Sequence, residues 1–385
     1  MVRKKNYNRI LVSTSSFMTV ETFLLLFIKS LSKYFDVYVM TNLNTLNKDQ
    51  INNFEKKFNF RLLHVPIKRK INLLYDFIAL LRIIFIIRKL KPNISLSLNP
   101  KAGLLSSISA FINRVSIRVH IFNGQIWYNK IGFKKNFLKF FDHLTFNLSN
   151  RILCESFSQK DFLKKNGFLK KDITILGHGS MMGVDTNFFR PNSKIRNSLK
   201  EKYNLKKSDK ICMFVGRINY DKGINMIMHA SNYFSNKDNI FFVLVGDNEL
   251  ESFEFFNLIK GQKNIIYLGH QKNINQILNI ADLVLLPSLR EGFGISVIEA
   301  GCLEKPAIIS DIDGLRDTVT HNETGLLFEV NNKNDFVSKI NYLLDRKKLS
   351  KKMGKKAREN ILKKYERKTV VNLYTQYLID LCKHI

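Results

Sequence analysis

The stretch ADLVLLPSLREGFGISVIEAG, residues 281–301, contains the pattern that decides the fold. Its short apolar run 283–286 has the composition of a buried β-strand, and a loop with two glycines follows. An apolar helical pattern then begins near Ile295. A strand, a tight glycine loop and a helix in this order form half of a βαβ unit, so the stretch predicts a parallel sheet.

The same alternation of strands and helices extends over the whole chain. In the first half we expect strands at 10–13, 36–41, 62–65, 94–98, 115–122, 152–154 and 173–176, and helices at 22–33, 73–89, 104–112, 136–148 and 158–166. In the second half we expect strands at 211–215, 240–245, 265–268, 283–286, 307–310 and 325–328, and helices at 223–233, 274–279, 295–302, 333–344, 351–365 and 368–382. This order predicts an α/β fold of two tandem doubly wound Rossmann-like domains, which bind ligands beyond the carboxyl ends of their strands.

A polar and charged segment at residues 190–210, with one proline, marks the expected domain boundary. We therefore predict an N-terminal domain at 1–190 and a C-terminal domain at 191–367. The last stretch, 368–385, is expected to form a helix that packs back on the N-terminal domain. A length of 385 residues suits two domains of this size.

The chain is strongly basic, with 62 Lys and Arg against 32 Asp and Glu and a net charge of +30. Residues 1–190 hold 31 of the basic and 10 of the acidic side chains, so the excess lies mainly in the first half. Such a charge fits a nucleic acid or an anionic membrane as partner. The abundance of Lys, Asn, Ile and Phe also fits a codon bias toward A and T, which would give part of the charge no function.

Cysteine spacing and hydropathy indicate the compartment. The four cysteines lie far apart, which disfavours a disulfide framework or a zinc ribbon and favours a reducing cytoplasm. The most apolar stretches, 17–28 and 73–87, are interrupted by charged side chains, so neither is expected to span a membrane. Glu21 likewise interrupts the apolar region that a signal peptide would need.

The loop GRINYDKG, residues 216–223, follows a predicted strand and opens a helix. A glycine turn at a helix N-terminus suits an anion, and Arg217 and Lys222 add two cations. Together they could hold a diphosphate and stabilise it as a leaving group. The alternative, two solvated surface charges, is equally consistent with this motif alone.

The loop at 291–294 places Glu291 between a strand and a helix, with Glu299 about one turn inside that helix. Helix amides attract phosphate, whereas carboxylates repel phosphate and accept hydrogen bonds from hydroxyl groups. A nucleotide sugar supplies both kinds of group. Complementarity to the helix dipole is an alternative explanation for Glu299, but not for Glu291.

With these motifs in order, the chain resembles the retaining glycosyltransferases of family 4, which have the GT-B architecture of two Rossmann-like domains facing across a cleft. The second half matches in GRINYDKG at 216–223, VGDN at 245–248, ADLVLLPS at 281–288, EGFGISVIEAG at 291–301 and ETGLLFE at 323–329. The first half resembles a bacterial branch that assembles capsule, O-antigen and glycan-lipids. It matches in NPKAGLLSSISA at 99–110, FNGQIW at 122–127, ILCESFSQKDFL at 152–163 and GHGSMMGVDTNFF at 177–189.

The resemblance implies that the domain at 1–190 binds the acceptor and that the domain at 191–367 binds the nucleotide sugar. It also implies a role for each matched residue. Arg217 and Lys222 would bind the donor diphosphate, Glu291 would contact the transferred sugar, and Glu299 would bind the ribose. The donor-binding set implied is Gly216, Arg217, Lys222, Glu291, Gly292, Phe293, Gly294, Ile295 and Glu299, of which Glu291, Arg217 and Lys222 are catalytic.

The resemblance also implies the reaction: transfer of a hexosyl or N-acetylhexosaminyl group from a UDP-sugar, with retention and without a metal or other cofactor. The D-x-D pair Asp311 and Asp313 is a less favoured metal alternative, since it follows the donor motif in a strand-to-helix loop. A sugar-nucleotide epimerase of the same two-domain fold is the nearest rival enzyme, and the paired glutamates argue against it.

The first domain departs from the family at two points. Residues 13–16, Ser-Thr-Ser-Ser, stand where many relatives carry a glycine pair, and Asn123 stands where many carry a histidine. The candidate acceptor or cleft residues are therefore Asn123, Gly124, Gln125 and His178. His120 lies on a predicted strand and is expected to be a core or edge residue.

The basic first half suggests a membrane-bound acceptor. Lys68, Arg69 and Lys70 precede an amphipathic pattern, and a second one interleaves Lys130, Lys134, Lys135 and Lys139 with Ile131, Phe133, Phe137 and Phe140. The alternative is an ordinary solvated helix packed by its Phe face. We expect a peripheral protein at the cytoplasmic face of the plasma membrane that receives a polyprenyl-diphosphate-linked sugar. No nucleic-acid partner is expected, because no helix-turn-helix, zinc finger or RNP-like run occurs.

Overall fold

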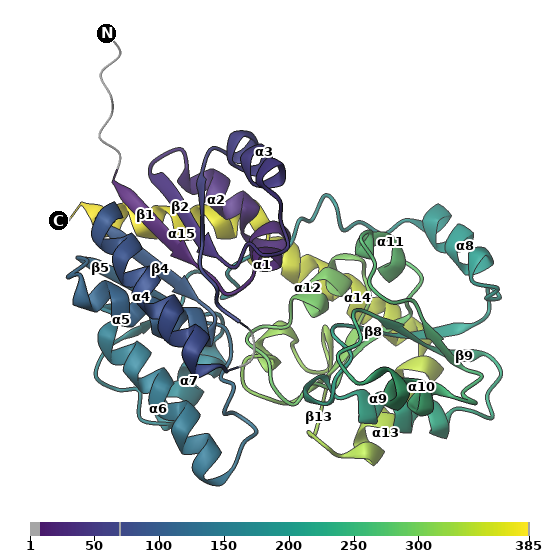
Figure 1. The fold of residues 1–385 in the computed structure, drawn as a ribbon. Helices are drawn as coiled ribbons and strands as arrows, with labels where there is room; N and C mark the ends of the chain where they lie inside the picture. Colours follow the sequence, from purple (N-terminus) through teal and green to yellow (C-terminus); the bar gives the residue numbers. More distant parts are fainter. Residues whose placement is uncertain (1–7, 69–70, 384–385) are drawn as a thin grey trace. The chain divides into compact units, whose positions relative to one another are not determined.

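The computed structural model describes residues 8–68 and 71–383, and the chain forms two compact units. The first comprises the N-terminal part up to Met182 together with the chain from Lys368, and the second spans Gly183–Arg367 (Figure 1). The observed division thus falls a few residues before the boundary placed at 190. Part of the segment 190–210 is helical, as α8 (Ser193–Lys202).

The first unit is a seven-stranded parallel sheet with the strand order β3-β2-β1-β4-β5-β6-β7. Its strands are β1 (Arg9–Ser13), β2 (Asp36–Thr41), β3 (Arg61–His64), β4 (Ile94–Leu98), β5 (Ile117–Phe122), β6 (Arg151–Cys154) and β7 (Ile173–Thr174). Its helical segments are α1 (Phe17–Thr19), the π-helical turn η1 (Val20–Leu24), α2 (Leu25–Leu31), α3 (Lys48–Phe58), α4 (Leu73–Leu90), α5 (Pro100–Ile112), α6 (Gly132–Leu148), α7 (Phe157–Lys165) and α15 (Arg367–Cys382).

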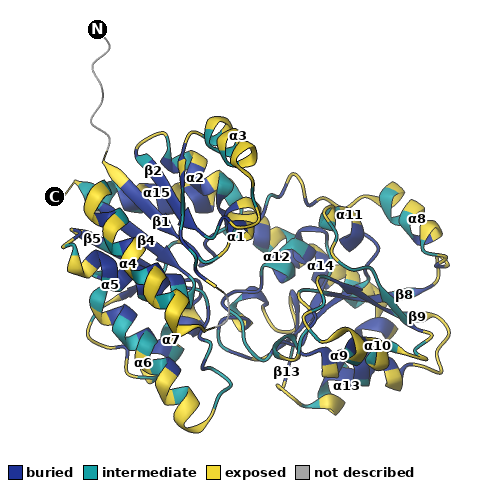
Figure 2. Ribbon diagram, in the orientation of Figure 1, coloured by how far each residue is buried: buried dark blue, intermediate teal, exposed yellow. Residues whose placement is uncertain are grey.

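Helices cover both faces of this sheet, which is why its strands are almost uniformly apolar. Successive residues of β1 point to opposite faces: Ile10 and Val12 enter a core cluster with α2 and α15, and Leu11 enters one with α4 and α5. Helix α15 packs into the first cluster through buried Val370, Tyr374 and Leu378, so the C-terminal helix completes the N-terminal fold (Figures 1 and 2).

The second unit is a six-stranded parallel sheet with the order β10-β9-β8-β11-β12-β13. Its strands are β8 (Lys210–Val215), β9 (Ile240–Val245), β10 (Ile265–Tyr267), β11 (Leu283–Leu286), β12 (Ala307–Ser310) and β13 (Gly325–Phe328). Besides α8, its helical segments are the 3₁₀ turn η2 (Tyr220–Lys222), α9 (Ile224–Tyr233), α10 (Ser252–Ile259), α11 (Ile274–Leu278), α12 (Ile295–Cys302), the 3₁₀ turn η3 (Arg316–Thr318), α13 (Lys333–Asp345) and α14 (Lys347–Lys364).

Most expected elements are present within a few residues, and three helices were missed. Helix α3 begins at a capping box between Asn47 and Gln50. Its apolar stripe of Ile51, Phe54 and Phe58 packs partly buried against the first core cluster, and this helical pattern was overlooked. Helices α8 and α10 each bury a single residue, Lys200 and Phe255. In the part of the chain that the structure describes, no helix is both long and apolar enough to cross a membrane.

Candidate active site

The loops that carry the donor motif follow β8 and β11, which are neighbours in the centre of the second sheet. The chain runs outward in one direction from β8 to β10 and in the other from β11 to β13. A doubly wound sheet binds ligands where its strand order reverses, because the loops after the two central strands diverge there. The topology therefore places residues 216–223 and 287–294 at the expected ligand position.

These two loops are joined to each other along their backbones. The Leu289 amide donates to the Asp221 carbonyl oxygen at 2.8 Å, and Arg290 pairs with the Asp221 carboxylate at 3.2 Å. Gly223 has a φ of 78°, and a Cβ there would lie 1.9 Å from the Pro287 carbonyl oxygen. Only glycine fits both the backbone conformation and this close approach. The two loops therefore form one structural piece.

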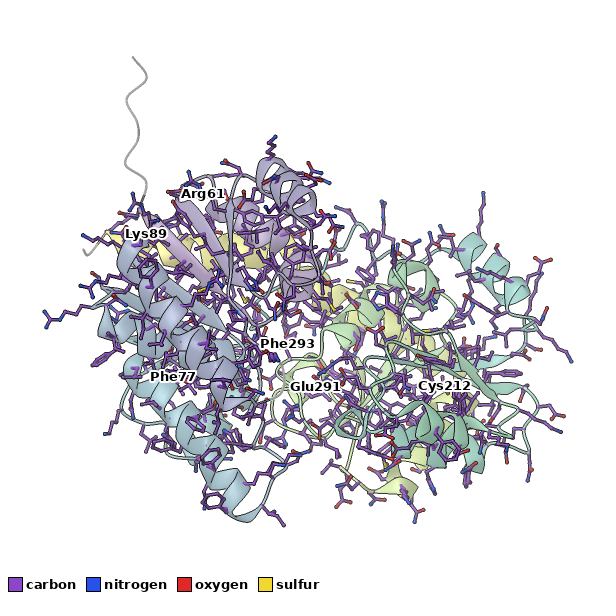
Figure 3. All side chains as sticks on the ribbon, in the orientation of Figure 1. Arg61, Phe77, Lys89, Cys212, Glu291 and Phe293 are labelled. Atoms are coloured by element: carbon purple, nitrogen blue, oxygen red, sulfur yellow. The ribbon has the colours of Figure 1, made fainter. Side chains whose placement is uncertain are left out.

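Lys222 and Glu291 form the polar centre of this piece. The Lys222 ammonium lies 2.5 Å from a Glu291 carboxylate oxygen, which also accepts from the Ser288 hydroxyl at 2.9 Å. The two charged side chains are only 18% and 12% exposed, so solvent screens their attraction weakly. Glu291 is labelled in Figure 3, on the loop before α12. The structure thus brings together two of the three predicted catalytic residues, 69 positions apart.

Gly314 packs against the backbone of Glu291 and Gly292, and it was not among the predicted site residues. Its φ is 87°, and a Cβ there would lie 2.4 Å from the Glu291 carbonyl oxygen and 3.0 Å from that of Gly292. The position of Glu291 therefore depends on a glycine from the loop after β12. The available signal was the turn sequence Asp313-Gly314, because such dipeptides favour turns with positive φ.

Arg217 has a different carboxylate partner. Its guanidinium donates to both oxygens of Glu249, at 2.9 and 3.1 Å, and Asn219 donates to the same carboxylate at 2.7 Å. Gly246 allows the loop after β9 to approach the loop after β8, since a Cβ there would lie 2.0 Å from the Gly216 carbonyl oxygen. Arg217 is 43% exposed, so an anionic ligand can reach it. Glu249 was not among the predicted site residues.

The N-terminus of α12 begins directly after the Glu291 loop. Gly294 is its N-cap, with a φ of 76° and no side-chain capping bond, and a Cβ there would lie 2.4 Å from Leu315. Gly292 and Phe293 are buried, and the Phe293 ring packs edge-on against Tyr365, with the centroids 5.2 Å apart. Ile295 is half-buried. Phe293 therefore anchors the turn that presents the helix amides.

Glu299 is the fifth residue of α12, beyond its first turn, so complementarity to the helix dipole does not explain it. The residue is partly exposed, yet its carboxyl group is surrounded by protein. Burial raises the pKa of this carboxyl to about 7, and the Arg367 charge opposes that shift. A carboxyl group that is costly to ionise in the free protein would gain from hydroxyl donors of a ligand.

The first unit has its own polar cluster at its strand-order reversal, between β1 and β4. Asn99, after β4, has a φ of 65° and a ψ of 147°, which is strained for a residue with a side chain. Its side-chain oxygen accepts from the Thr14 hydroxyl at 2.5 Å and from the Ser15 amide at 3.4 Å. The Asn123 side-chain oxygen accepts from the Asn99 amide at 3.4 Å. Asn99 was missed as a site residue, although it opens the matched stretch 99–110.

The other first-unit candidates differ in exposure. Gly124 is buried with a φ of 93°, and Gln125 is 2% exposed with its side-chain nitrogen lacking a hydrogen-bond partner among the described residues. His178 is exposed, between two glycines of positive φ. His120 is buried, 2.9 Å from the Ser97 hydroxyl, and burial lowers its pKa to about 3. That placement agrees with its expected role as a core histidine.

The alternative metal pair is engaged by an arginine. Arg316 lies 2.9 Å from the Asp311 carboxylate and 3.9 Å from that of Asp313. Across residues 8–68 and 71–383, no group of three or more His, Cys, Asp or Glu side chains is arranged to hold a metal ion.

Comparisons with known proteins match this architecture. The family model "Glycosyl transferases group 1" matches residues 195–360. The chain is 30% identical to the capsular polysaccharide biosynthesis glycosyltransferase CapM of Staphylococcus aureus, over 80% of this chain and 83% of that protein. It is 28% identical to an Escherichia coli UDP-Gal:alpha-D-GlcNAc-diphosphoundecaprenol alpha-1,3-galactosyltransferase, over 76% of this chain and 77% of that protein.

Solved structures share the fold at lower identity. Anabaena HepE in complex with UDP-glucose superposes with a TM-score of 0.77 at 15% identity, covering 97% of this chain and all of that one. Sucrose-phosphate synthase from Thermosynechococcus elongatus gives 0.81 at 16% identity, over 99% of this chain and all of that one. The two Rossmann-like halves are those of a GT-B glycosyltransferase.

The chain belongs to the group 1 glycosyl transferases, in the branch that includes the S. aureus capsular enzyme. It is therefore a glycosyltransferase, as the resemblance implied, rather than an epimerase of the same fold.

Replacing Gly314 by alanine should displace the Glu291 loop and reduce glycosyl transfer by about 100-fold, because a shift near 1 Å in a catalytic group has an effect of that size. The matched control is Gly261→Ala: Gly261 also has a positive φ, 78°, but nothing lies within 4 Å of a Cβ there. Initial transfer rates and circular dichroism of both variants test this. Equal losses in the two would mean that backbone strain alone matters.

Replacing Glu299 by glutamine should stabilise the protein at alkaline pH. The pKa of the Glu299 carboxyl is about 7 in the folded state and 4.5 ordinarily, so ionising it destabilises the folded protein. This loss of stability is absent below pH 4.5, develops as the pH rises to 7 and remains constant above that. The free energy of unfolding of the variant, relative to that of the wild type, should therefore increase by up to about 3 kcal/mol between pH 4.5 and pH 8. Urea unfolding of both proteins across this range measures the difference, and parallel curves would contradict the shift.

Proposed function

We propose that this enzyme transfers a hexosyl or N-acetylhexosaminyl group from a UDP-sugar to a sugar on a polyprenyl diphosphate, with retention, during assembly of a bacterial surface polysaccharide or glycan-lipid. The observation that carries the proposal is the Lys222–Glu291 pair at the reversal point of the second sheet, oriented by Ser288 and Gly314. This pair combines an ammonium group that can bind phosphate with a carboxylate that can accept hydrogen bonds from sugar hydroxyls.

The cations would stabilise the leaving group. As the bond between the sugar and the donor diphosphate breaks, negative charge grows on the phosphate oxygens. Lys222, held in place by Glu291 before the donor arrives, needs little reorganisation to meet that charge. Arg217 would exchange Glu249 for a phosphate in the bidentate geometry that guanidinium groups favour.

Retention follows from attack on the same face as the departing group. The acceptor hydroxyl forms the new bond to the anomeric carbon while the bond to the diphosphate oxygen breaks. The hydroxyl proton passes to that departing oxygen, so the step balances without a side-chain base. Glu291 would orient the transferred sugar and Glu299 the ribose, each by accepting from hydroxyls.

Relatives support the donor and acceptor. Names of similar enzymes contain UDP-Gal and diphosphoundecaprenol in E. coli, and N,N'-diacetylbacillosaminyl-diphospho-undecaprenol in Campylobacter jejuni at 26% identity over 66% of this chain and 68% of that one. We propose that the reaction needs no metal, because Arg217, Lys222 and the α12 amides would meet the diphosphate.

Substituting Lys222 or Glu291 by alanine should lower the transfer rate by about 100- to 1,000-fold, the range found when one preorganised electrostatic group is removed. A panel of UDP-sugars, assayed first by thermal stabilisation and then by transfer, identifies the donor to use. Lys260→Ala removes an exposed lysine of the same unit and serves as the charge-matched control for Lys222. Full activity in both site variants would refute the proposed function.

We further propose that the first unit docks on an anionic membrane through α4 and α6, which flank α5 on the same face of the sheet (Figure 1). Helix α4 buries Ala79, Ile83 and Ile87 and exposes Leu73, Phe77 and Phe85 at 82%, 58% and 67%. A large exposed apolar area of this kind is typical of an interaction surface.

On α6, three of the aromatic residues do not pack inward. Phe133, Phe137 and Phe140 are 84%, 44% and 60% exposed, whereas the buried set of this helix includes Leu138 and Phe146. These three Phe residues therefore do not form the face by which α6 packs on its unit, which supports the proposed membrane contact. Lys68 lies over the Tyr75 ring; Arg69 and Lys70 lie outside the described residues.

Neutralising Lys134, Lys135 and Lys139 to glutamine should reduce flotation with phosphatidylglycerol vesicles, since each basic residue at an anionic surface contributes about 1 kcal/mol. Lys139 should contribute least, because its ammonium lies 3.4 Å from the Asn166 side-chain oxygen and over the Trp127 ring. The control neutralises exposed Lys164, Lys165 and Lys170 of the same unit. Unchanged flotation in the first variant would exclude α6 as the contact.

A further inference from the structure

A second basic site lies in the second unit, at the opposite end of the sheet from the donor loops. A cavity of about 630 Å³ is lined by residues that precede or begin β8, β11 and β12, including Lys210, Leu283 and Pro306. Strand β8 has six residues, so its two ends lie about 20 Å apart. The cavity therefore shares no residue with the Lys222–Glu291 site, and its volume suits a small ligand.

Three lysines of α14 line this cavity at four-residue intervals. Lys347, Lys351 and Lys355 fall on one helix face, where neighbours are about 5–6 Å apart, and all three are exposed. None of them has an ion-pair partner among the described residues. Like charges at this spacing repel each other and destabilise a helix, so the fold itself does not account for the arrangement.

The remaining wall of the cavity is also rich in cations. Lys207, Lys210 and Lys305 line it, and Lys305 donates to the Asn279 carbonyl oxygen at 3.0 Å. Burial lowers the pKa of the Lys305 ammonium to about 8, and the Arg196 charge lowers it further. Of the three lining carboxylates, Asp282 pairs with Arg196 at 2.7 Å and Asp209 accepts from the Lys206 amide at 2.7 Å. Glu304 is the third lining carboxylate, and Lys210 pairs with the Asp345 carboxylate at 3.7 Å. Seven lining cations thus face three lining carboxylates.

We propose that this cavity is a binding site for a multiply charged phosphate group, formed by Lys347, Lys351 and Lys355. Lysine ammonium groups bind phosphate as point charges and do not require one fixed ligand geometry. The phosphate can belong to a free polyphosphate or nucleotide, or to a lipid headgroup. The site is independent of the donor site and does not rest on the proposed function.

Tripolyphosphate is the probe, measured by isothermal titration calorimetry at constant ionic strength. All proteins carry Arg217→Ala and Lys222→Ala, so that the donor loops contribute little. Adding Lys347→Gln, Lys351→Gln and Lys355→Gln should weaken binding by about ten-fold or more. The matched control adds Lys348→Gln, Lys352→Gln and Lys363→Gln, which removes the same charge from exposed positions of the same helix that do not line the cavity.

The outcomes separate clearly. A ten-fold loss of tripolyphosphate affinity in the cavity variant with little loss in the control supports the site. An equal loss of affinity in both variants, or no binding by the parent protein, overturns it. Since the three lysines repel each other, their removal should also leave the unfolding temperature unchanged or higher, which excludes misfolding as the cause. Flotation with phosphatidylglycerol vesicles then identifies the source: a parallel loss indicates a lipid headgroup, and no loss indicates a free phosphate compound.

Discussion

The candidate active site of this glycosyltransferase depends on the contact between the loops after β8 and β11. The Lys222–Glu291 ion pair exists because the Leu289 amide bonds to the Asp221 carbonyl and Gly223 lies against the Pro287 carbonyl. The positions of Lys222 and Glu291 therefore depend on both loops. The carboxylate orients the ammonium, and the two backbones hold the carboxylate. A low solvent exposure then keeps their attraction from being screened.

Glycine is the means by which these loops approach each other. Gly223 and Gly314 both have positive φ, and each lies against a carbonyl oxygen of the loop after β11. A side chain at either position would push that loop away. The spacing of glycines in the two motifs is therefore a packing requirement as much as a phosphate-binding one, and it explains why the motifs occur together.

The charge of +30 divides into parts with different physical roles. Arg196 and Lys200 donate to backbone carbonyl oxygens, so their charge is used to hold the chain. Arg217 and Lys222 are paired with carboxylates at the donor loops. Lys347, Lys351 and Lys355 repel each other on one helix face. A total charge does not separate these roles, because each depends on what surrounds the side chain.

The amino-acid sequence alone predicted the two α/β units and the positions of most strands along the chain. It also predicted Lys222 and Glu291 for one site, and the structure places their side chains 2.5 Å apart. Period and composition carry that information, since strands buried on both faces must be apolar and glycine loops must follow them. Helix α3, whose apolar stripe is only partly buried, and helix α8 within 190–210 were not predicted. Three features become visible only in the folded chain: Gly314 and Ser288 contact Glu291, Asn99 is strained beside Asn123, and three lysines line one cavity. These depend on contacts between segments far apart in the chain, which no local pattern encodes.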